Sequence, residues 1–226
     1  MNQPPNFNRL ARLYLWMEWL SFGPWLSLTR LTFLPRLRNA RRALVLGDGD
    51  GRFTAHLLRA NPRVQIDAVD ASAAMLAALK RRAAPHSDRL TTHLADIRTW
   101  QPDAALYDLI ATHFFLDCLT TSEVQTLAIR LRPAVSPNAL WVISDFAVPP
   151  NSFGRLVALP VVSGLYLSFG LLTGLAVRRL PNHSAALAAA GFTLLQQHPR
   201  LAGLLIAELW SAAVSETDPS PTPSLL

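Results

Sequence analysis

A glycine-rich turn that contains acids is the most informative stretch of the sequence, LVLGDGDGRF at residues 44–53. A turn that joins a buried strand to a helix points backbone amides into the crevice at the carboxyl end of a sheet, where ligands bind. Three glycines alternate here with Asp48 and Asp50, so the loop combines close backbone approach with negative charge. We therefore predict a ligand-binding loop whose contact residues are Gly47, Asp48, Gly49 and Gly51.

The spacing of the glycines indicates which ligand fits. Dinucleotide-binding folds need G-x-G-x-x-G, but here Arg52 stands where the last glycine belongs, and Gly51 comes one position earlier. No G-K-[ST] follows, which excludes a Walker phosphate loop. S-adenosylmethionine carries no phosphate: a sulfonium, an amino group and a carboxylate are joined to adenosine. Because this ligand presents cations and hydroxyls to the acids of the loop, we predict it as the cofactor.

Two further acids follow expected strands. Asp70 ends the second strand, 19 residues after Gly51, where its carboxylate can accept both ribose hydroxyls, with Ala71 beside it. A helix-start acid, favoured by the helix dipole, is the alternative for Asp70. Asp96 ends the third strand, where it can accept the adenine amino group, with Ile97 against the ring. A plain turn aspartate is an equal alternative for Asp96.

The groups expected near the transferred methyl follow the fourth and fifth strands. Methyl transfer is an in-line displacement at an activated sulfonium, so positioning supplies much of the rate, and a base is needed only when the acceptor loses a proton. His113, beside Thr112, is the first candidate base; a histidine bonded to backbone at a strand end is an equal alternative. Asp117 would orient His113 if that turn is helical. Asp145 is another inward carboxylate, and we predict no metal site.

A doubly wound parallel sheet must position these residues. Short apolar runs predict strands, and amphipathic stretches between them predict helices, one of which starts at a capping box formed by Thr120 and Glu123. We expect an α/β fold with a seven-stranded, Rossmann-like sheet whose last strand is antiparallel. The expected strands are 41–47, 64–70, 90–96, 107–115 and 139–146, followed by a helix in 184–190 and two strands separated by QQHPRLAG at 196–203.

Other segments flank this sheet. Residues 156–177 carry no charge and are long enough to span a membrane, but Pro160 and three glycines favour two short apolar helices over a pocket instead. Pro24 divides the N-terminal region into two short helices. The expected organisation is an N-terminal helical cap at 1–40, an α/β domain at 41–211 with an apolar cover at 150–182, and a disordered tail at 212–226.

The composition and charge of the chain limit the classes of molecule that it is expected to bind. The net charge is +6, and only Lys80 among 21 basic residues is a lysine, but the basic flanks are also the most apolar parts of the chain. We therefore expect no nucleic acid, and a lipophilic small molecule as substrate; peripheral membrane contact through 153–179 and a homodimer remain open. The single cysteine, Cys118, excludes an internal disulfide. Without a secretory signal, we expect a cytoplasmic protein, with a position at the inner membrane left open.

These motifs, in this order, resemble the class I S-adenosylmethionine-dependent methyltransferases, over residues from about 40 to 210. Their sheet has seven strands with the last antiparallel. In outline the sequence is most similar to the ubiquinone and menaquinone-biosynthesis C-methyltransferases, on the stretches LSFGPWLSL (20–28), ISDFAVPP (143–150) and the final hairpin. The resemblance implies methyl transfer to a small lipophilic or aromatic acceptor, such as a quinone precursor or a polyketide-like phenol.

One position departs from that family. An acid that holds the methionine amino group is usual two residues before the first glycine, and Val45 stands there. Asp48 or Asp50 would have to replace it. The departure gives some support to the alternative of a non-catalytic partner subunit or membrane-surface scaffold with this fold, against which Asp70, Asp96 and the glycine loop count. A third possibility, an NAD-linked oxidoreductase, is disfavoured by Arg52.

Overall fold

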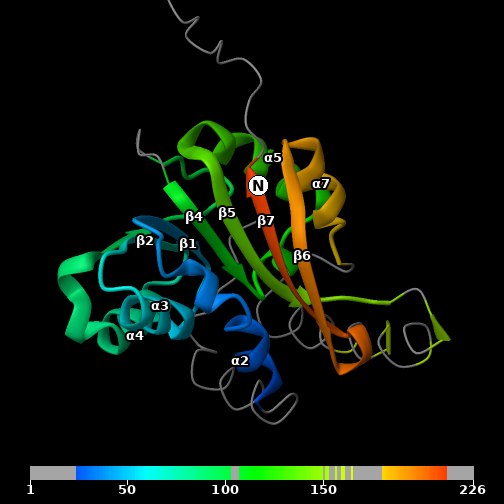
Figure 1. Cartoon of the computed structure of the whole chain (residues 1–226), viewed down its shortest axis with the longest axis horizontal. Coiled ribbons are helices and arrows are strands. Elements are labelled where there is room, and N and C mark those ends of the chain that lie inside the picture. Colours follow the sequence, from blue (N-terminus) through cyan, green and yellow to red (C-terminus); the bar gives the residue numbers. More distant parts are fainter. Residues whose placement is uncertain are drawn as a thin grey trace, which may run out of the picture.

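The chain forms a seven-stranded mixed sheet with helices on both faces (Figure 1), which confirms the expected fold class. The computed structural model describes residues 24–102, 107–149, 151–152, 156, 159–160, 164 and 180–212. The strand order is β3-β2-β1-β4-β5-β7-β6. The strands are β1 Arg42–Leu46, β2 Gln65–Asp70, β3 Leu90–Leu94, β4 Tyr107–His113, β5 Val135–Phe146, β6 Phe192–Arg200 and β7 Leu205–Ala212. Strand β7 runs antiparallel to both β5 and β6.

The two faces of the sheet pack against different helices. The helices are α2 Trp25–Arg30, α3 Arg52–Ala60, α4 Ala73–Arg82, α5 Thr121–Leu131 and α7 His183–Ala189. Side chains alternate between the faces along each strand, so Val45 packs with Phe53 of α3, whereas Leu46 packs with Leu127 of α5. Figure 1 shows α5 and α7 together behind the strands, away from α3 and α4. Each face thus has its own apolar core, and in such folds ligands bind at the carboxyl ends of the strands between the two faces.

Local sequence explains where the helices start. Ser72 accepts a hydrogen bond from the Met75 amide and so caps α4. Thr120 and Glu123 form the predicted capping box of α5, each side chain accepting the amide hydrogen bond of the other residue. Helix α2 follows Pro24. The expected first helix, most of the 150–182 cover and nearly all of the tail lie outside the described residues. None of the described helices is long and apolar enough to cross a membrane.

Strands β4 and β5 differ from their predicted bounds because of two residues with left-handed backbone. Phe114 has φ 53° and ends β4 at His113, two residues early. Asn138 has φ 61°, and the pairing of β4 with β5 shifts between Tyr107 and Leu109. Such an irregularity lets a strand continue past a turn-like stretch, so β5 begins at Val135 instead of 139.

The prediction that the whole stretch QQHPRLAG separates the last two strands was wrong. The polar stretch QQHPR belongs to β6, and only the short 3-10 turn Leu201–Gly203 separates β6 from β7. Because β6 is an edge strand with mostly exposed side chains, polar residues and Pro199 are tolerated there. Apolar periodicity alone does not detect such a strand.

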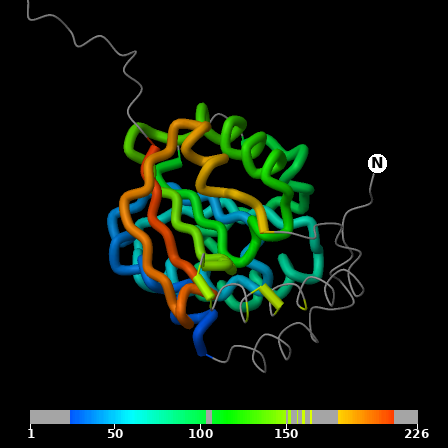
Figure 2. The backbone as a smooth tube through the Cα atoms, turned by 90° about the vertical axis from the view of Figure 1, so that its right-hand side faces the viewer, coloured from blue at the N-terminus to red at the C-terminus, as the bar shows by residue number. Residues whose placement is uncertain are grey.

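Helix α2 lies at the carboxyl edge of the parallel strands. In Figures 1 and 2 it is the dark blue helix below the sheet, on the side toward which β4 and β5 run. The hydroxyl of Ser144, near the end of β5, donates a hydrogen bond to the Thr29 carbonyl over 3.2 Å. The segment before β1 is thereby fixed against the crevice.

Candidate active site

The glycine loop has the backbone geometry that only glycine adopts easily. Gly47, Gly49 and Gly51 have φ values of 63°, 59° and 80°. A Cβ on Gly47 would lie 2.1 Å from a ring carbon of Phe115, and one on Gly51 would lie 2.8 Å from the Leu79 Cα. The loop therefore approaches the segment after β4 and helix α4 too closely for any side chain.

Asp48 is turned inward, onto the helix that follows the loop. Its carboxylate accepts hydrogen bonds from the amides of Phe53 (3.3 Å) and Thr54 (2.8 Å), so it caps α3. Burial raises the pKa of Asp48, against the lowering effects of nearby Arg30 and of these bonds. Each carboxylate oxygen accepts one amide of the protein, and the role of Asp48 as a substitute for the missing acid at position 45 stays a prediction.

The carboxylate of Asp50 is also bound by the protein, in this case through ion pairs with two arginines. Its carboxylate lies 3.3 Å from Arg52 Nε and 2.5 Å from Arg82 Nη2, and Arg82 also donates to its carbonyl. These contacts fasten the loop to the start of α3 and the end of α4. Val45, the position where an acid was expected, is buried in the core of the α3 face. In this structure the carboxylates of both loop acids bind groups of the protein itself.

Asp70 ends β2, as predicted, beside the loop. Its Oδ1 accepts the Ser72 amide over 2.8 Å. Burial raises the pKa of Asp70 to about 6, and the neighbouring Asp48 adds to that rise. Ala71, next in the chain, is exposed. A ligand that donates hydrogen bonds to this buried carboxyl would stabilise its ionised form.

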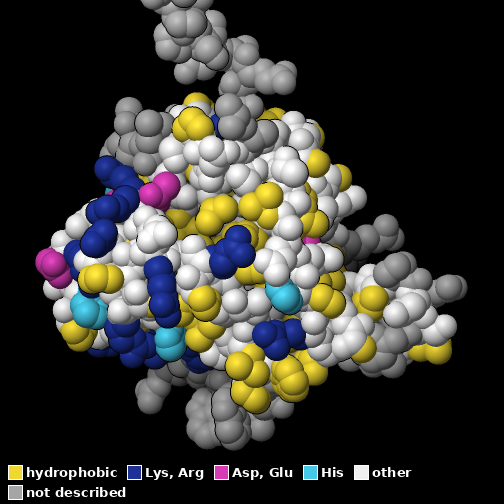
Figure 3. Space-filling view, in the orientation of Figure 1, with side chains coloured by type: hydrophobic (Ala, Val, Ile, Leu, Met, Phe, Trp, Pro, Cys, Tyr) yellow, Lys and Arg dark blue, Asp and Glu magenta, His cyan; other side chains and the backbone are white. Residues whose placement is uncertain are grey.

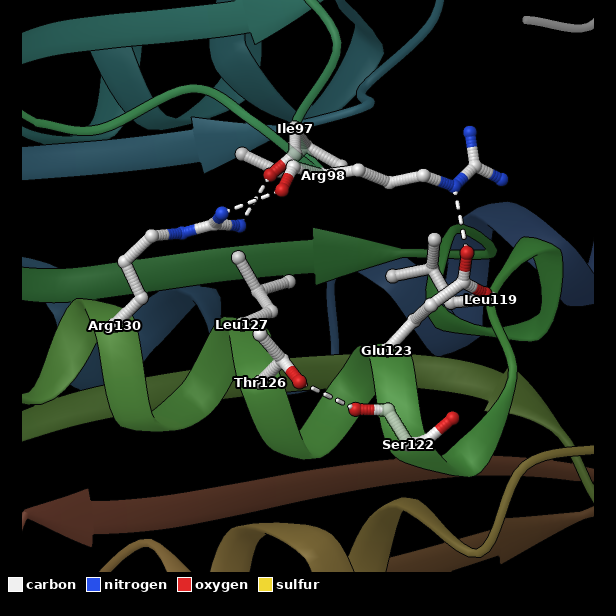
Figure 4. Close-up of a pocket in the computed structure, with 8 residues that line it drawn as sticks. All are labelled: Ile97, Arg98, Leu119, Ser122, Glu123, Thr126, Leu127 and Arg130. Atoms are coloured by element: carbon white, nitrogen blue, oxygen red, sulfur yellow. Dashed lines mark hydrogen bonds and ion pairs between the residues drawn. The ribbon is translucent and has the colours of Figure 1, made fainter. Parts of the chain in front are cut away.

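Asp96 lies two residues beyond the end of β3, in a turn where its carboxylate accepts the Arg98 amide over 2.9 Å. Arg98 also pairs with Glu123 of α5 over 2.8 Å. From the same helix, Arg130 donates hydrogen bonds to the carbonyls of Ile97 and Arg98, as Figure 4 shows. Arg98 thus binds the aspartate itself and Arg130 holds the turn that follows it, and the Asp96 side chain is about one third exposed (31%).

A small pocket lies beside this turn, between the segment after β3 and helix α5 (Figure 4). Ile97, an expected adenine contact, lines it together with the apolar side chains of Leu119 and Leu127. Its remaining lining residues are Arg98, Ser122, Glu123, Thr126 and Arg130. The pocket places an apolar wall next to Asp96, on the α5 side of the crevice.

His113 is buried on the α3 face. Its Nδ1 lies 3.0 Å from the Ser144 hydroxyl, and its ring packs on Phe53 with centroids 4.2 Å apart. Burial, and then the charge of Arg30, hold the pKa of His113 well below 6.5, so the ring is neutral at pH 7. Its Nε2 has no hydrogen-bond partner among the described residues. Ser144, and not Asp117, is the side chain that orients His113.

Asp117 and Asp145 lie together on the α5 side of the sheet, opposite the face on which His113 is buried. Asp145 Oδ2 accepts the Asp117 amide over 3.2 Å, and the Cys118 thiol donates to Asp117 over 3.5 Å. Burial raises the pKa of both carboxyls, to about 6 for Asp117 and well above 3.8 for Asp145, where the charge of Asp117 contributes. Thr112 also points to this face, where its hydroxyl accepts the Trp141 indole over 3.0 Å. The structure therefore joins the two acids and separates them from His113.

Sequence reasoning missed two groups of polar residues. Arg30 is 8% exposed and lies over the Phe114 ring, 5.4 Å from its centroid. Glu208 of β7 is fully buried and binds His183 over 2.9 Å, with Gln197 and Trp210 as further donors. Both groups sit inside apolar stretches of sequence, so no local pattern marks them. The described residues contain no cluster of three potential metal ligands.

The comparisons with known proteins agree with this geometry. Residues 43–138 match the family model described as a methyltransferase domain. No curated protein matches the chain in sequence. Among solved structures, the N-methyltransferase NodS from Bradyrhizobium japonicum WM9 has a TM-score of 0.59 at 15% identity, over 84% of this chain and 97% of that one. An O-methyltransferase from Nostoc punctiforme PCC 73102, described as putative, has a TM-score of 0.70 at 18% identity.

The alignment with the Nostoc protein covers 92% of this chain and 61% of that longer chain. NodS in complex with S-adenosyl-L-homocysteine matches with a TM-score of 0.61 at 16% identity, over 89% of this chain and 98% of that one. At these identities the likeness establishes the fold, and the match to the methyltransferase-domain model covers residues 43–138.

Proposed function

We propose that this methyltransferase domain uses S-adenosylmethionine to methylate a small lipophilic or aromatic acceptor. The observation that carries the proposal is the loop of three left-handed glycines at the carboxyl end of β1, with the buried Asp70 at the end of the neighbouring strand. The family match and the S-adenosyl-L-homocysteine bound in NodS support the same cofactor.

The cofactor lies along the ends of strands β1 to β3 in this proposal. The backbone of Gly47, Gly49 and Gly51 faces the sulfur and its amino-acid chain. The carboxylate of Asp70 accepts the ribose hydroxyls, beside Ala71. Asp96 accepts the adenine amino group, with Ile97 against the ring. The arginine contacts from α5 support this last interaction, since they hold the turn that presents Asp96.

Asp117 is the better candidate base for an acceptor that must lose a proton. A carboxyl with a pKa of about 6 is ionised at pH 7 and is basic enough to take a proton. Burial and the charge of Asp117 raise the pKa of Asp145 and so favour its neutral form. His113 keeps a positioning role at the end of β4, since its low pKa makes it a weak proton acceptor.

The expected lipophilicity of the acceptor has support at the crevice end of the molecule. Hydrophobic side chains gather over α2 in Figure 3, where Trp25 is 41% and Leu28 48% exposed. Leu156, within the proposed cover, is 78% exposed. Apolar side chains around the entrance suit an acceptor resembling a quinone precursor or a phenol, delivered from solution or from a membrane surface.

Calorimetric titration with S-adenosylhomocysteine and with NAD tests the cofactor. We expect binding of the first alone; binding of NAD alone would establish the oxidoreductase alternative. Methyl transfer from labelled S-adenosylmethionine to prenylated and unprenylated phenols then tests the acceptor. Cofactor binding without transfer to any acceptor in the panel would favour the non-catalytic subunit.

A further inference from the structure

The exposed charges of the molecule are unevenly distributed. Among the described residues, every exposed basic side chain lies between Arg36, in the 3-10 helix Leu34–Leu37, and Arg82, at the end of α4. The one exposed acid among these described residues, Asp88, comes after that stretch, and the acids within it are buried or half-buried. In Figure 3 the basic side chains spread over α3 and α4. This side of the molecule therefore presents an excess of positive charge to solvent.

A buried asparagine brings four of these arginines together. The Nδ2 of Asn61 donates hydrogen bonds to the carbonyls of Leu37 (3.0 Å) and Ala40 (2.7 Å), and its Oδ1 accepts the Arg63 amide over 2.9 Å. These bonds fasten the segment before β1 to the end of α3. The exposed arginines on both sides of this connection form what we call the arginine patch: Arg36, Arg38, Arg59 and Arg63.

Nearby acids do not neutralise the arginine patch. Within the described part of the chain, none of its four members forms an ion pair. The two acids of residues 36–82 that form ion pairs, Asp50 and Asp67, bind other arginines. Burial lowers the pKa of His56 on α3, and the charges of three arginines, Arg59 among them, lower it again. The patch thus has a positive potential that favours an anionic partner.

Helix α2 presents exposed apolar side chains beside the arginine patch. Trp25 and Leu28 are exposed on α2, which only the turn 31–33 separates from the 3-10 helix that carries Arg36. Figure 3 shows the hydrophobic side chains over α2 on the same face of the molecule as the basic side chains over α3. Guanidinium groups bind phosphate through parallel hydrogen bonds, and tryptophan and leucine bury apolar surface at the headgroup boundary of a bilayer. We propose that the arginine patch and α2 dock together onto a membrane surface that contains anionic phospholipids.

The apolar part of this face favours a membrane over a nucleic acid. Phosphates of either partner would bind the arginines, but Trp25 and Leu28 both gain from burial only where hydrocarbon lies beneath the phosphates. Helix α2 also lies at the carboxyl edge of the sheet, so docking would bring that edge next to the bilayer. A lipophilic acceptor would then reach the site from the membrane, a consequence that rests on the proposed function, whereas the docking itself does not.

Cosedimentation of the full chain with lipid vesicles tests the proposal. We expect tighter binding to vesicles of equimolar phosphatidylcholine and phosphatidylglycerol than to phosphatidylcholine alone, and a loss of that preference at high salt. The double variant Arg36→Gln, Arg38→Gln should bind the mixed vesicles about 25-fold more weakly, from about fivefold for each arginine near an anionic surface. Trp25→Ala should weaken binding to both kinds of vesicle by a similar factor.

The control is the double variant Gln125→Glu, Ala188→Glu, which lowers the net charge by the same amount at exposed positions of α5 and α7. It should bind the mixed vesicles within about twofold of the wild type, since charges on the far side are screened. Thermal unfolding shows whether each variant folds, and Arg59→Gln, Arg63→Gln provides the answer if the first patch variant does not.

Three results would overturn the docking proposal. They are failure of the wild type to bind the mixed vesicles, losses of equal size in the patch and control variants, and unchanged binding in both patch variants. Tighter binding to duplex DNA than to the mixed vesicles would assign the arginine patch to nucleic acid and overturn the proposal as well. Titration with S-adenosylhomocysteine tests the proposed function separately, so the failure of one is distinguishable from the failure of the other.

Discussion

The carboxylates of the glycine loop and those that follow β4 and β5 have opposite kinds of surroundings. Asp48 and Asp50 are bound by amides and arginines of their own loop and its helices. Asp117 and Asp145 lie against each other, and burial raises the pKa of both. The first pair shapes the loop, whereas the second pair consists of buried carboxyls whose pKa values are raised. The bonding partner of an acid, more than its distance from the loop in sequence, decides its role.

Asp117→Asn should have the largest effect. If Asp117 is the base, kcat falls by about 100-fold or more, while the Kd for S-adenosylhomocysteine stays within about twofold. Steady-state kinetics and calorimetry measure the two quantities. Asp88→Asn, at an exposed aspartate, is the matched control. Because the carboxylate is the active form, wild-type kcat/KM should rise through pH 6, near the pKa of Asp117. A near-normal kcat in Asp117→Asn would remove Asp117 from the mechanism.

Asp70→Asn should weaken cofactor binding and increase the free energy of unfolding. Loss of charge-assisted bonds to the ribose lowers affinity for S-adenosylhomocysteine about 10- to 100-fold. The folded-state pKa of Asp70 is raised from 3.8 to about 6, so ionisation costs stability as pH rises through that window. The neutral Asn avoids this cost, and the free energy of unfolding at pH 8 should increase by at most about 3 kcal/mol.

Urea denaturation of Asp70→Asn and wild type at pH 8 and near pH 4 measures this effect. The two proteins should differ at pH 8 and converge at the lower pH, where the wild-type carboxyl is protonated in the folded state. A stability difference that does not depend on pH would contradict the explanation.

Asp48→Ala should lower the free energy of unfolding and leave kcat unchanged. Removing a carboxylate that caps α3 costs about 1 to 2 kcal/mol in the free energy of unfolding. Asp48→Asn, which keeps an oxygen acceptor, should lose less, and chemical denaturation compares the two. Once both are folded, kcat should match the wild type. A large loss of kcat in a stable Asp48 variant would show that this acid acts on the reaction.

Asp50→Ala should have the smallest effect of the four. Its partners Arg52 and Arg82 have side chains 30% and 44% exposed, and exposed ion pairs contribute about 0.2 to 1 kcal/mol. Affinity for S-adenosylhomocysteine should stay within about threefold by calorimetry. If Asp50→Ala binds the cofactor far more weakly, the two loop acids differ in role, and Asp50 is a ligand contact after all.

Patterns with a local physical cause were predictable from the sequence. The alternation of apolar runs and amphipathic stretches fixes the order of elements, and the capping box at Thr120 and Glu123 marks the start of α5. The glycine spacing identified the loop because positive φ values exclude other residues. Long-range contacts were not predictable: Ser144 with His113 depends on the register of β5 against β4, and Arg30 lies over the Phe114 ring only once α2 has packed.

Strand β6 has a consequence for behaviour at high concentration. It is the last strand on its side of the sheet formed by the described residues, and Leu194 and Leu195 are 40% and 54% exposed, a combination that invites other chains to extend the sheet. The register shift between Leu194 and Gln196 twists the strand, and Pro199 removes one amide donor. Both irregularities work against the addition of a further strand at this edge.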